Sequence, residues 1–141
     1  MPAMNMKDVL SEMAAGLGGA YVMIVADNDG MLLSSWEAPG NLLPPEMLGG
    51  FIQTINGAIT AFKNSSTEFG KLDDVIYNMG FSSIVIKPVA DAACFIVVDA
   101  PKTVPLGMIR MACNNYVPRM EQSLPGHEPL PRRDGMGTIA P

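Results

Sequence analysis

Three consecutive strand-like segments constrain the fold of this 141-residue chain more than any other feature. Residues 74–79, 82–89 and 94–99 are rich in Val and Ile, and only a few residues separate each from the next. Parallel strands need a crossover of a dozen or more residues, so links this short allow only antiparallel neighbours. The third segment is apolar on both faces and is predicted to be central. The first is more polar and is predicted to lie at an open edge.

A hairpin precedes these strands. Residues 21–26 form a continuous apolar run, as expected of a strand covered on both faces. Asp27–Gly30 then predicts a tight turn, with the glycine supplying positive φ. Residues 31–36 return as a second strand that contains two serines, which suit an edge. Trp36 is expected to cover the core.

Apolar residues recur at helical spacing in three places. The first helix starts after Asn5, a capping residue, and ends in the glycine-rich stretch 16–19. A long helix follows the Pro44-Pro45 pair. A third starts near 103–105 and carries Pro118, which is predicted to kink or break it. The three apolar stripes are Met6, Val9, Leu10, Met13, Ala14 and Leu17; Met47, Leu48, Phe51, Ile52, Ile55, Ala58, Ile59 and Phe62; and Leu106, Ile109, Cys113, Tyr116, Val117, Met120 and Leu124.

The long helix carries a second ridge, made of small side chains. Gly50, Thr54, Gly57 and Ala61 follow one another at helical spacing. Each glycine inside a helix costs about 1 kcal/mol relative to alanine, and exposure to solvent does not require that cost. A small ridge lets another backbone approach closely, so it predicts a helix contact. The partner is either the same helix in a second copy or an internal neighbour.

Charge and hydropathy exclude several classes of partner. The net charge is −5, and the region before Pro125 holds seven basic against twelve acidic residues. An acidic body is unsuited to nucleic acid or to an anionic membrane. No apolar run approaches the roughly 18 to 20 residues of a membrane span. Residues 1–124 are therefore expected to form one domain, and the Pro- and Gly-rich residues 125–141 a disordered tail.

The sulfur-containing residues favour packing over chemistry. Cys94 opens an apolar strand and Cys113 lies on an apolar helix face, so both are expected to be small buried residues in a reducing, cytoplasmic protein. The twelve methionines are interpreted mainly as adaptable core residues, with a methionine-lined binding face as the alternative.

No catalytic, cofactor-binding or metal-binding residue is predicted. The single histidine, His127, lies in the expected tail. The carboxylate pair Asp27 and Asp29 is explained by turn capping, and the pair Asp73 and Asp74 by solvation at a strand end. Arg110 is interpreted as a salt-bridge or capping residue, with an arginine finger as the alternative.

The chain resembles a known family. The order of elements, the Asp-x-Asp-Gly turn within Val25 to Gly30, and the stretch Asp99-x-Pro101 followed by Leu106-Gly107-x-x-Arg110 are similar to those of the Roadblock/dynein-light-chain family. The resemblance covers roughly residues 5 to 124.

The resemblance implies an α/β (α+β) fold, a profilin-like three-layer α/β/α sandwich with a five-stranded antiparallel sheet. The long helix would cover one face, and the first and last helices the other. Members of the family pair through the long helix and the third strand. The predicted dimer interface therefore comprises Gly50, Thr54, Gly57, Ala61, Val75 and Tyr77.

The resemblance also implies a function. Prokaryotic members of the MglB type bind a Ras-like small GTPase as dimers and have no catalytic residue of their own. This chain is accordingly expected to be a cytoplasmic, homodimeric, non-enzymatic adaptor that modulates the nucleotide cycle of such a GTPase. The alternatives are a structural scaffolding module without effect on GTP hydrolysis, and a small-ligand sensor or enzyme on a similar sandwich.

Overall fold

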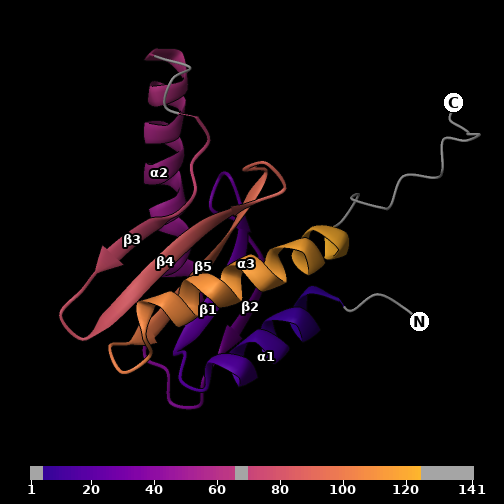
Figure 1. Ribbon diagram of the computed structural model, residues 1–141, viewed down its shortest axis with the longest axis vertical. Helices are drawn as coiled ribbons and strands as arrows, with labels where there is room; N and C mark the ends of the chain where they lie inside the picture. The colour runs from indigo at the N-terminus through magenta and orange to yellow at the C-terminus, as the bar shows by residue number, and fades with distance from the viewer. Residues whose placement is uncertain (1–4, 66–69, 125–141) are drawn as a thin grey trace, which may run out of the picture.

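A five-stranded antiparallel sheet forms the centre of the molecule (Figure 1). The computed structural model describes residues 5–65 and 70–124, and of residues 62–65 the backbone only. The strands lie in the order β2-β1-β5-β4-β3, so β2 and β3 are the edges and β5 is central, as predicted. The strands are β1 (Val22–Asp27), β2 (Leu32–Glu37), β3 (Val75–Asn78), β4 (Ser82–Val89) and β5 (Cys94–Pro101). The helices are α1 (Met6–Leu17), α2 (Pro45–Ser65) and α3 (Leu106–Ser123).

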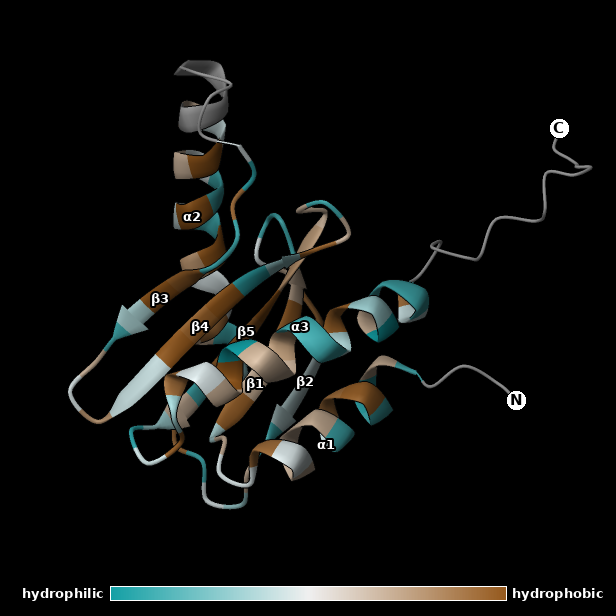
Figure 2. Cartoon of the chain, in the orientation of Figure 1, coloured by the Kyte–Doolittle hydropathy of each residue, from teal (hydrophilic) through white to brown (hydrophobic). Residues whose placement is uncertain are grey.

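The sheet separates two apolar cores, which confirms the expected three-layer sandwich. Alternate residues of β1 show the division: Met23 packs with α1 and α3, whereas Ile24 packs with α2. In Figure 1, α1 and α3 run side by side over one face, and α2 crosses the other face and extends beyond the sheet. Figure 2 shows the apolar strands between these layers.

Local sequence signals set the ends of α1. The Asn5 side chain accepts a hydrogen bond from the Asp8 backbone N–H at 2.8 Å, which caps the first turn. Gly18 ends the helix with φ of 74°, a conformation that favours glycine. Both features are those that the sequence predicted.

The third helix departs from prediction at Pro118. The helix continues through this proline to Ser123, so the expected break is wrong. Tyr116 and Val117 before the proline and Met120 after it all pack on the same core, and this shared burial holds the helix together across the missing N–H. Leu106, expected in the buried stripe, is 38% exposed.

The methionines divide between the core and the surface. Four are buried, which fits adaptable packing: Met6, Met13, Met23 and Met120. Five others keep between 44% and 67% of their surface exposed, so core filling is the wrong explanation for them: Met31, Met47, Met79, Met108 and Met111.

A close approach between two glycines attaches the hairpin turn to α2. A Cβ placed on Gly49 would lie 2.3 Å from the Gly30 carbonyl oxygen, and one on Gly30 would lie 2.5 Å from the Gly49 oxygen. Gln53, one helical turn further along α2, donates from Nε2 to the Asp29 carbonyl at 2.9 Å. The β1–β2 turn therefore fixes the position of α2 on the sheet.

The helices of the described chain include no candidate membrane span. Within residues 5–65 and 70–124, none is long and apolar enough to cross a bilayer.

Candidate self-association surface

The outer face of α2 is an exposed stripe of small residues. Gly50, Thr54, Gly57 and Ala61 are all exposed, and Met47 extends the stripe toward the start of the helix at 61% exposure. The helix packs its opposite side on β1 and β2, while α1 and α3 lie on the other face of the sheet. An internal helix is therefore not the neighbour of this ridge in the described chain.

The glycines of α2 differ in what they meet. Gly49 is buried against the backbone of Gly30, so a side chain there is excluded within one chain. Around Gly50 and Gly57, by contrast, nothing in the described structure lies within 4 Å of an added Cβ. Each of these two glycines costs about 1 kcal/mol of helix stability relative to alanine. Within residues 5–65 and 70–124, no contact at these two positions requires a glycine.

Strand β3 provides an open edge beside this helix. The Met79 N–H donates to the Ser82 carbonyl of the hairpin at 3.0 Å, so the backbone groups of Met79 point toward β4. Successive residues of a strand point their backbone groups in opposite directions, so the N–H and C=O of Tyr77, two residues earlier, also point toward β4. The N–H and C=O groups of Ile76 and Asn78 therefore point outward. Sequence reasoning did not single out these two residues, since strand parity requires a known register.

Val75 and Tyr77, the predicted interface residues of this strand, have half-buried side chains that pack with the α2 core. The Tyr77 ring lies 4.7 Å, centroid to centroid, from that of Phe51 on α2. This contact places β3 and α2 next to each other. The ridge and the open strand edge consequently belong to one continuous side of the molecule.

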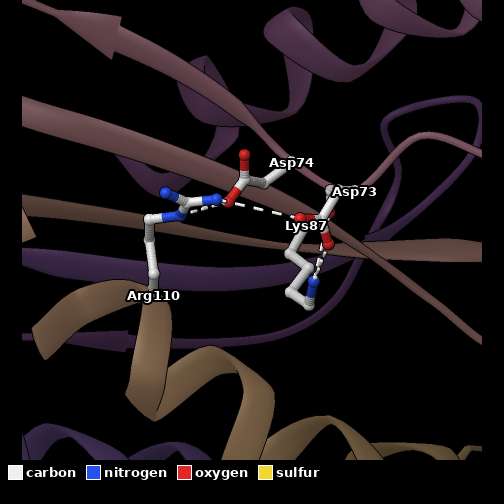
Figure 3. Close-up of polar contacts among 4 residues, drawn as sticks. All are labelled: Asp73, Asp74, Lys87 and Arg110. Carbon is white, nitrogen blue, oxygen red and sulfur yellow. Dashed lines mark hydrogen bonds and ion pairs between the residues drawn. The ribbon is translucent and has the colours of Figure 1, made fainter. Parts of the chain in front are cut away.

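An ionic network holds the start of β3 (Figure 3). Arg110 on α3 donates from Nε to Asp74 at 2.7 Å and lies 3.7 Å from Asp73. Lys87 on β4, only 15% exposed in its side chain, pairs with Asp73 at 2.9 Å and also donates to the Asp73 carbonyl at 3.1 Å. Solvation at a strand end is thus an incomplete explanation: Asp73 keeps 76% of its side chain exposed and Asp74 only 13%, and both carboxylates are ion-paired. They tie the edge strand to two other elements.

The network makes stability depend on pH in a defined direction. The Lys87 hydrogen bond and charge, aided by Arg110, hold the pKa of Asp73 below its usual value. A depressed pKa contributes stability above the ordinary carboxylate range, and this contribution is lost as pH falls through the folded value. We expect the stability difference between wild type and Asp73→Asn to be constant above about pH 5 and to shrink below about pH 4.

Urea unfolding at a series of pH values measures this difference. Asp91→Asn is the matched control, because its ion pair with Lys71 is exposed on both sides at 84% and 78%. A difference for Asp73→Asn that stays constant down to about pH 2 would contradict the role assigned to the network.

The remaining candidate residues have structural roles. Arg110 is engaged by Asp74, which confirms the salt-bridge interpretation. The Asp27 carboxylate accepts from the backbone N–H groups of Asp29 and Met31 at 2.9 and 3.0 Å, so it caps the turn as predicted. His127 lies outside the described residues, as does the predicted tail of residues 125–141.

Both cysteines are buried, as expected. Burial raises the pKa of the Cys94 and Cys113 thiols to about 12, which leaves them protonated and unreactive near neutral pH.

Asp99, part of the motif behind the family resemblance, is an acidic residue buried in the sheet. It is 5% exposed, and its Oδ1 finds no hydrogen-bond partner among the described residues. Burial raises the pKa of this carboxyl, and a hydrogen bond with the Ser82 side chain partly offsets the effect.

Within residues 5–65 and 70–124, no group of three potential ligands among His, Cys, Asp and Glu could hold a metal ion.

A pocket of about 170 Å³ lies where α2, the β4–β5 turn and α3 meet. Its lining includes apolar Ile59 and Leu72 beside charged Asp91 and Glu121. Sites for drug-sized ligands usually span about 300–1,000 Å³. This pocket is too small for such a ligand, so it gives little support to the ligand-sensor alternative.

The five-stranded sheet, with one long helix on one face and two helices on the other, is the Roadblock fold. Among solved structures, the chain is similar to the gliding protein mglB from Thermus thermophilus, with a TM-score of 0.65, 18% identity and coverage of 80% of this chain and 83% of the other. It is also similar to an MglB with a tetrameric arrangement, with a TM-score of 0.63, 19% identity and coverage of 83% and 88%. A Roadblock/LC7 domain from Streptomyces avermitilis gives a TM-score of 0.64 at 11% identity, with coverage of 82% and 93%. No protein-family model and no curated protein sequence matches the chain.

Proposed function

We propose that two copies of this chain associate through the outer face of α2 and the open edge of β3. The dimer would act as a cytoplasmic, non-enzymatic regulator that binds a Ras-like small GTPase and modulates its nucleotide cycle. The observation that carries the first step is the pair of exposed glycines, Gly50 and Gly57, beside an unpaired strand edge.

Association through this side explains both features together. Close packing of two α2 helices requires small residues at the ridge, whereas no contact in the described part of the chain requires Gly50 or Gly57. Pairing of two β3 strands satisfies the outward backbone groups of Ile76 and Asn78. The interface would comprise the predicted residues, extended by these two: Gly50, Thr54, Gly57, Ala61, Val75, Tyr77, Ile76 and Asn78.

The GTPase proposal rests on the family resemblance and on the shared fold. One similar structure is a gliding protein and another is an MglB with a tetrameric arrangement. We infer from the family resemblance, together with this shared fold, that the partner belongs to the class of Ras-like GTPases. Regulation would proceed by binding and repositioning the switch segments of the partner, with the catalytic groups supplied by the GTPase.

The test starts from a small GTPase captured on the immobilised wild-type chain from the source organism and identified by mass spectrometry. The purified GTPase is then assayed for GTP hydrolysis, nucleotide exchange and nucleotide affinity, with and without the chain. We expect at least one of these to change with saturable dependence on the concentration of the chain. Gly57→Leu, designed to prevent association, should lose the effect.

Two outcomes would contradict parts of the proposal. Binding of the GTPase without a change in hydrolysis, exchange or affinity would favour the scaffolding alternative. An unchanged effect with a monomeric Gly57→Leu variant would show that the regulatory surface does not need two copies.

A further inference from the structure

The two edge strands, β2 and β3, differ in whether a side chain is bonded to their outward-pointing backbone N–H and C=O groups. In β2, the Ala38 N–H that follows the strand donates to the Tyr21 carbonyl at 2.8 Å, so Ala38 faces the neighbouring strand. Alternation along the strand then directs the backbone groups of Ser35 and Glu37 outward. An incoming strand would have to bond with these groups.

Lys7 occupies one of these outward positions. Its Nζ donates a hydrogen bond to the Ser35 carbonyl at 2.9 Å, from the first turn of α1 to the middle of β2. The position of α1 is itself fixed, because Glu12 accepts a hydrogen bond from the Tyr116 hydroxyl at 2.9 Å and pairs with Arg119 on α3. A charged side chain that is held against an edge carbonyl places an ammonium where the next strand would lie.

The β2 edge is irregular as well as covered. The register between β1 and β2 shifts between Val25 and Ala26, which marks a bulge in the ladder. Bulges bend and twist an edge away from regular pairing. In β3 the register with β4 runs without a shift. Across the described residues, no side chain bonds to the backbone of Val75–Asn78.

We infer that Lys7 blocks strand addition at the β2 edge and thereby restricts growth of the sheet to β3. The inference deepens the proposed self-association: a dimer joined at β3 would have a Lys7-blocked β2 edge at each end, so its sheet would not extend further by strand pairing. The second copy is the occupant that Lys7 excludes from β2.

Lys7→Met tests this role, because methionine keeps most of the apolar stem and removes the ammonium. We expect the weight-average mass, measured by sedimentation, to rise to twice the wild-type value and above it as protein concentration increases, because each contact between two β2 edges leaves a further β2 edge open at either end. Hydrogen exchange should slow in the peptide that contains Ser35 and Glu37, because their outward N–H groups become bonded. Lys7→Arg retains a donor and should behave as wild type.

Lys71→Met is the matched control, because it removes one positive charge from an 84% exposed lysine whose partner is Asp91. A Lys7→Met mass equal to that of wild type at every concentration would overturn the inference. A larger species without slower exchange in β2 would also overturn it, since association would then use another surface. A monomeric wild type would refute only the proposed dimer, and Lys7→Met would then be expected to shift from monomer to dimer.

Discussion

Gly49→Ala is expected to be among the most destabilising single substitutions in this chain, with a loss of about 3 kcal/mol in the free energy of unfolding. The added Cβ would lie 2.3 Å from the Gly30 carbonyl oxygen, a distance that real contacts of this kind do not reach. Both sides of the contact are backbone, so no side chain can move aside. Either α2 or the β1–β2 turn must shift, and the Gln53 hydrogen bond to Asp29 would be lost with it.

The sign of this effect distinguishes the contact from ordinary helix propensity. Alanine in place of glycine within a helix normally stabilises by about 1 kcal/mol. Gly16 in α1 is exposed, with nothing within 4 Å of an added Cβ, so Gly16→Ala should show the normal gain. Urea unfolding of both variants measures the difference. A Gly49→Ala variant as stable as Gly16→Ala would show that the turn and the helix separate without cost.

Most of the fold could be predicted because its signals are local. The strands and the first helix lie within about two residues of their expected bounds, since hydrophobic periodicity and capping residues act over a few positions. The short links predicted the antiparallel arrangement of β3, β4 and β5, and the contrast between the polar β3 and the apolar β5 predicted their edge and central positions. The single five-stranded sheet was implied by the family resemblance. Pro118 was overestimated as a helix breaker because its neighbours' burial is a tertiary property.

The contacts that define the candidate site could be predicted only in part. The small ridge on α2 follows from spacing alone, and its exposure agrees with a contact outside the chain. Arg110 was expected to form an ion pair, yet its partner Asp74 is 36 positions away in sequence. Lys7 and Ser35 are separated by 28 positions, and Gly30 and Gly49 meet only after the sheet and helix are placed. Such pairings depend on topology, which no local pattern contains.

Helix α2 thus carries two kinds of glycine, which differ in the contacts that surround them. Gly49 is required by a contact within the chain, whereas Gly50 and Gly57 face open space. Spacing places Gly50 and Gly57 on one ridge and leaves Gly49 out, but it does not show what each glycine meets. The structure separates them by what a side chain would meet, and this makes Gly57 the sharpest test of self-association.

Gly57→Leu is expected to convert the dimer to monomers without unfolding the chain. Leucine has the higher helix propensity, and open space surrounds this position in the single chain, so the monomer should become more stable by up to about 1 kcal/mol. In the dimer the same side chain would separate two closely packed helices. Forcing a large side chain into a packed contact typically costs about 1–3 kcal/mol. The upper part of that range corresponds to about a hundredfold weaker association.

Sedimentation and urea unfolding of the same sample separate the two effects. Gly16→Leu is the matched control, since it places leucine at an exposed helix glycine on the other face of the sheet, away from the proposed interface. It should gain stability in the same way and keep the wild-type mass at every concentration. Gly57→Leu should instead have the mass of one chain, at concentrations where wild type has the mass of two. If both variants keep the wild-type mass, the ridge does not contact a second copy, and the cost of its glycines requires another explanation.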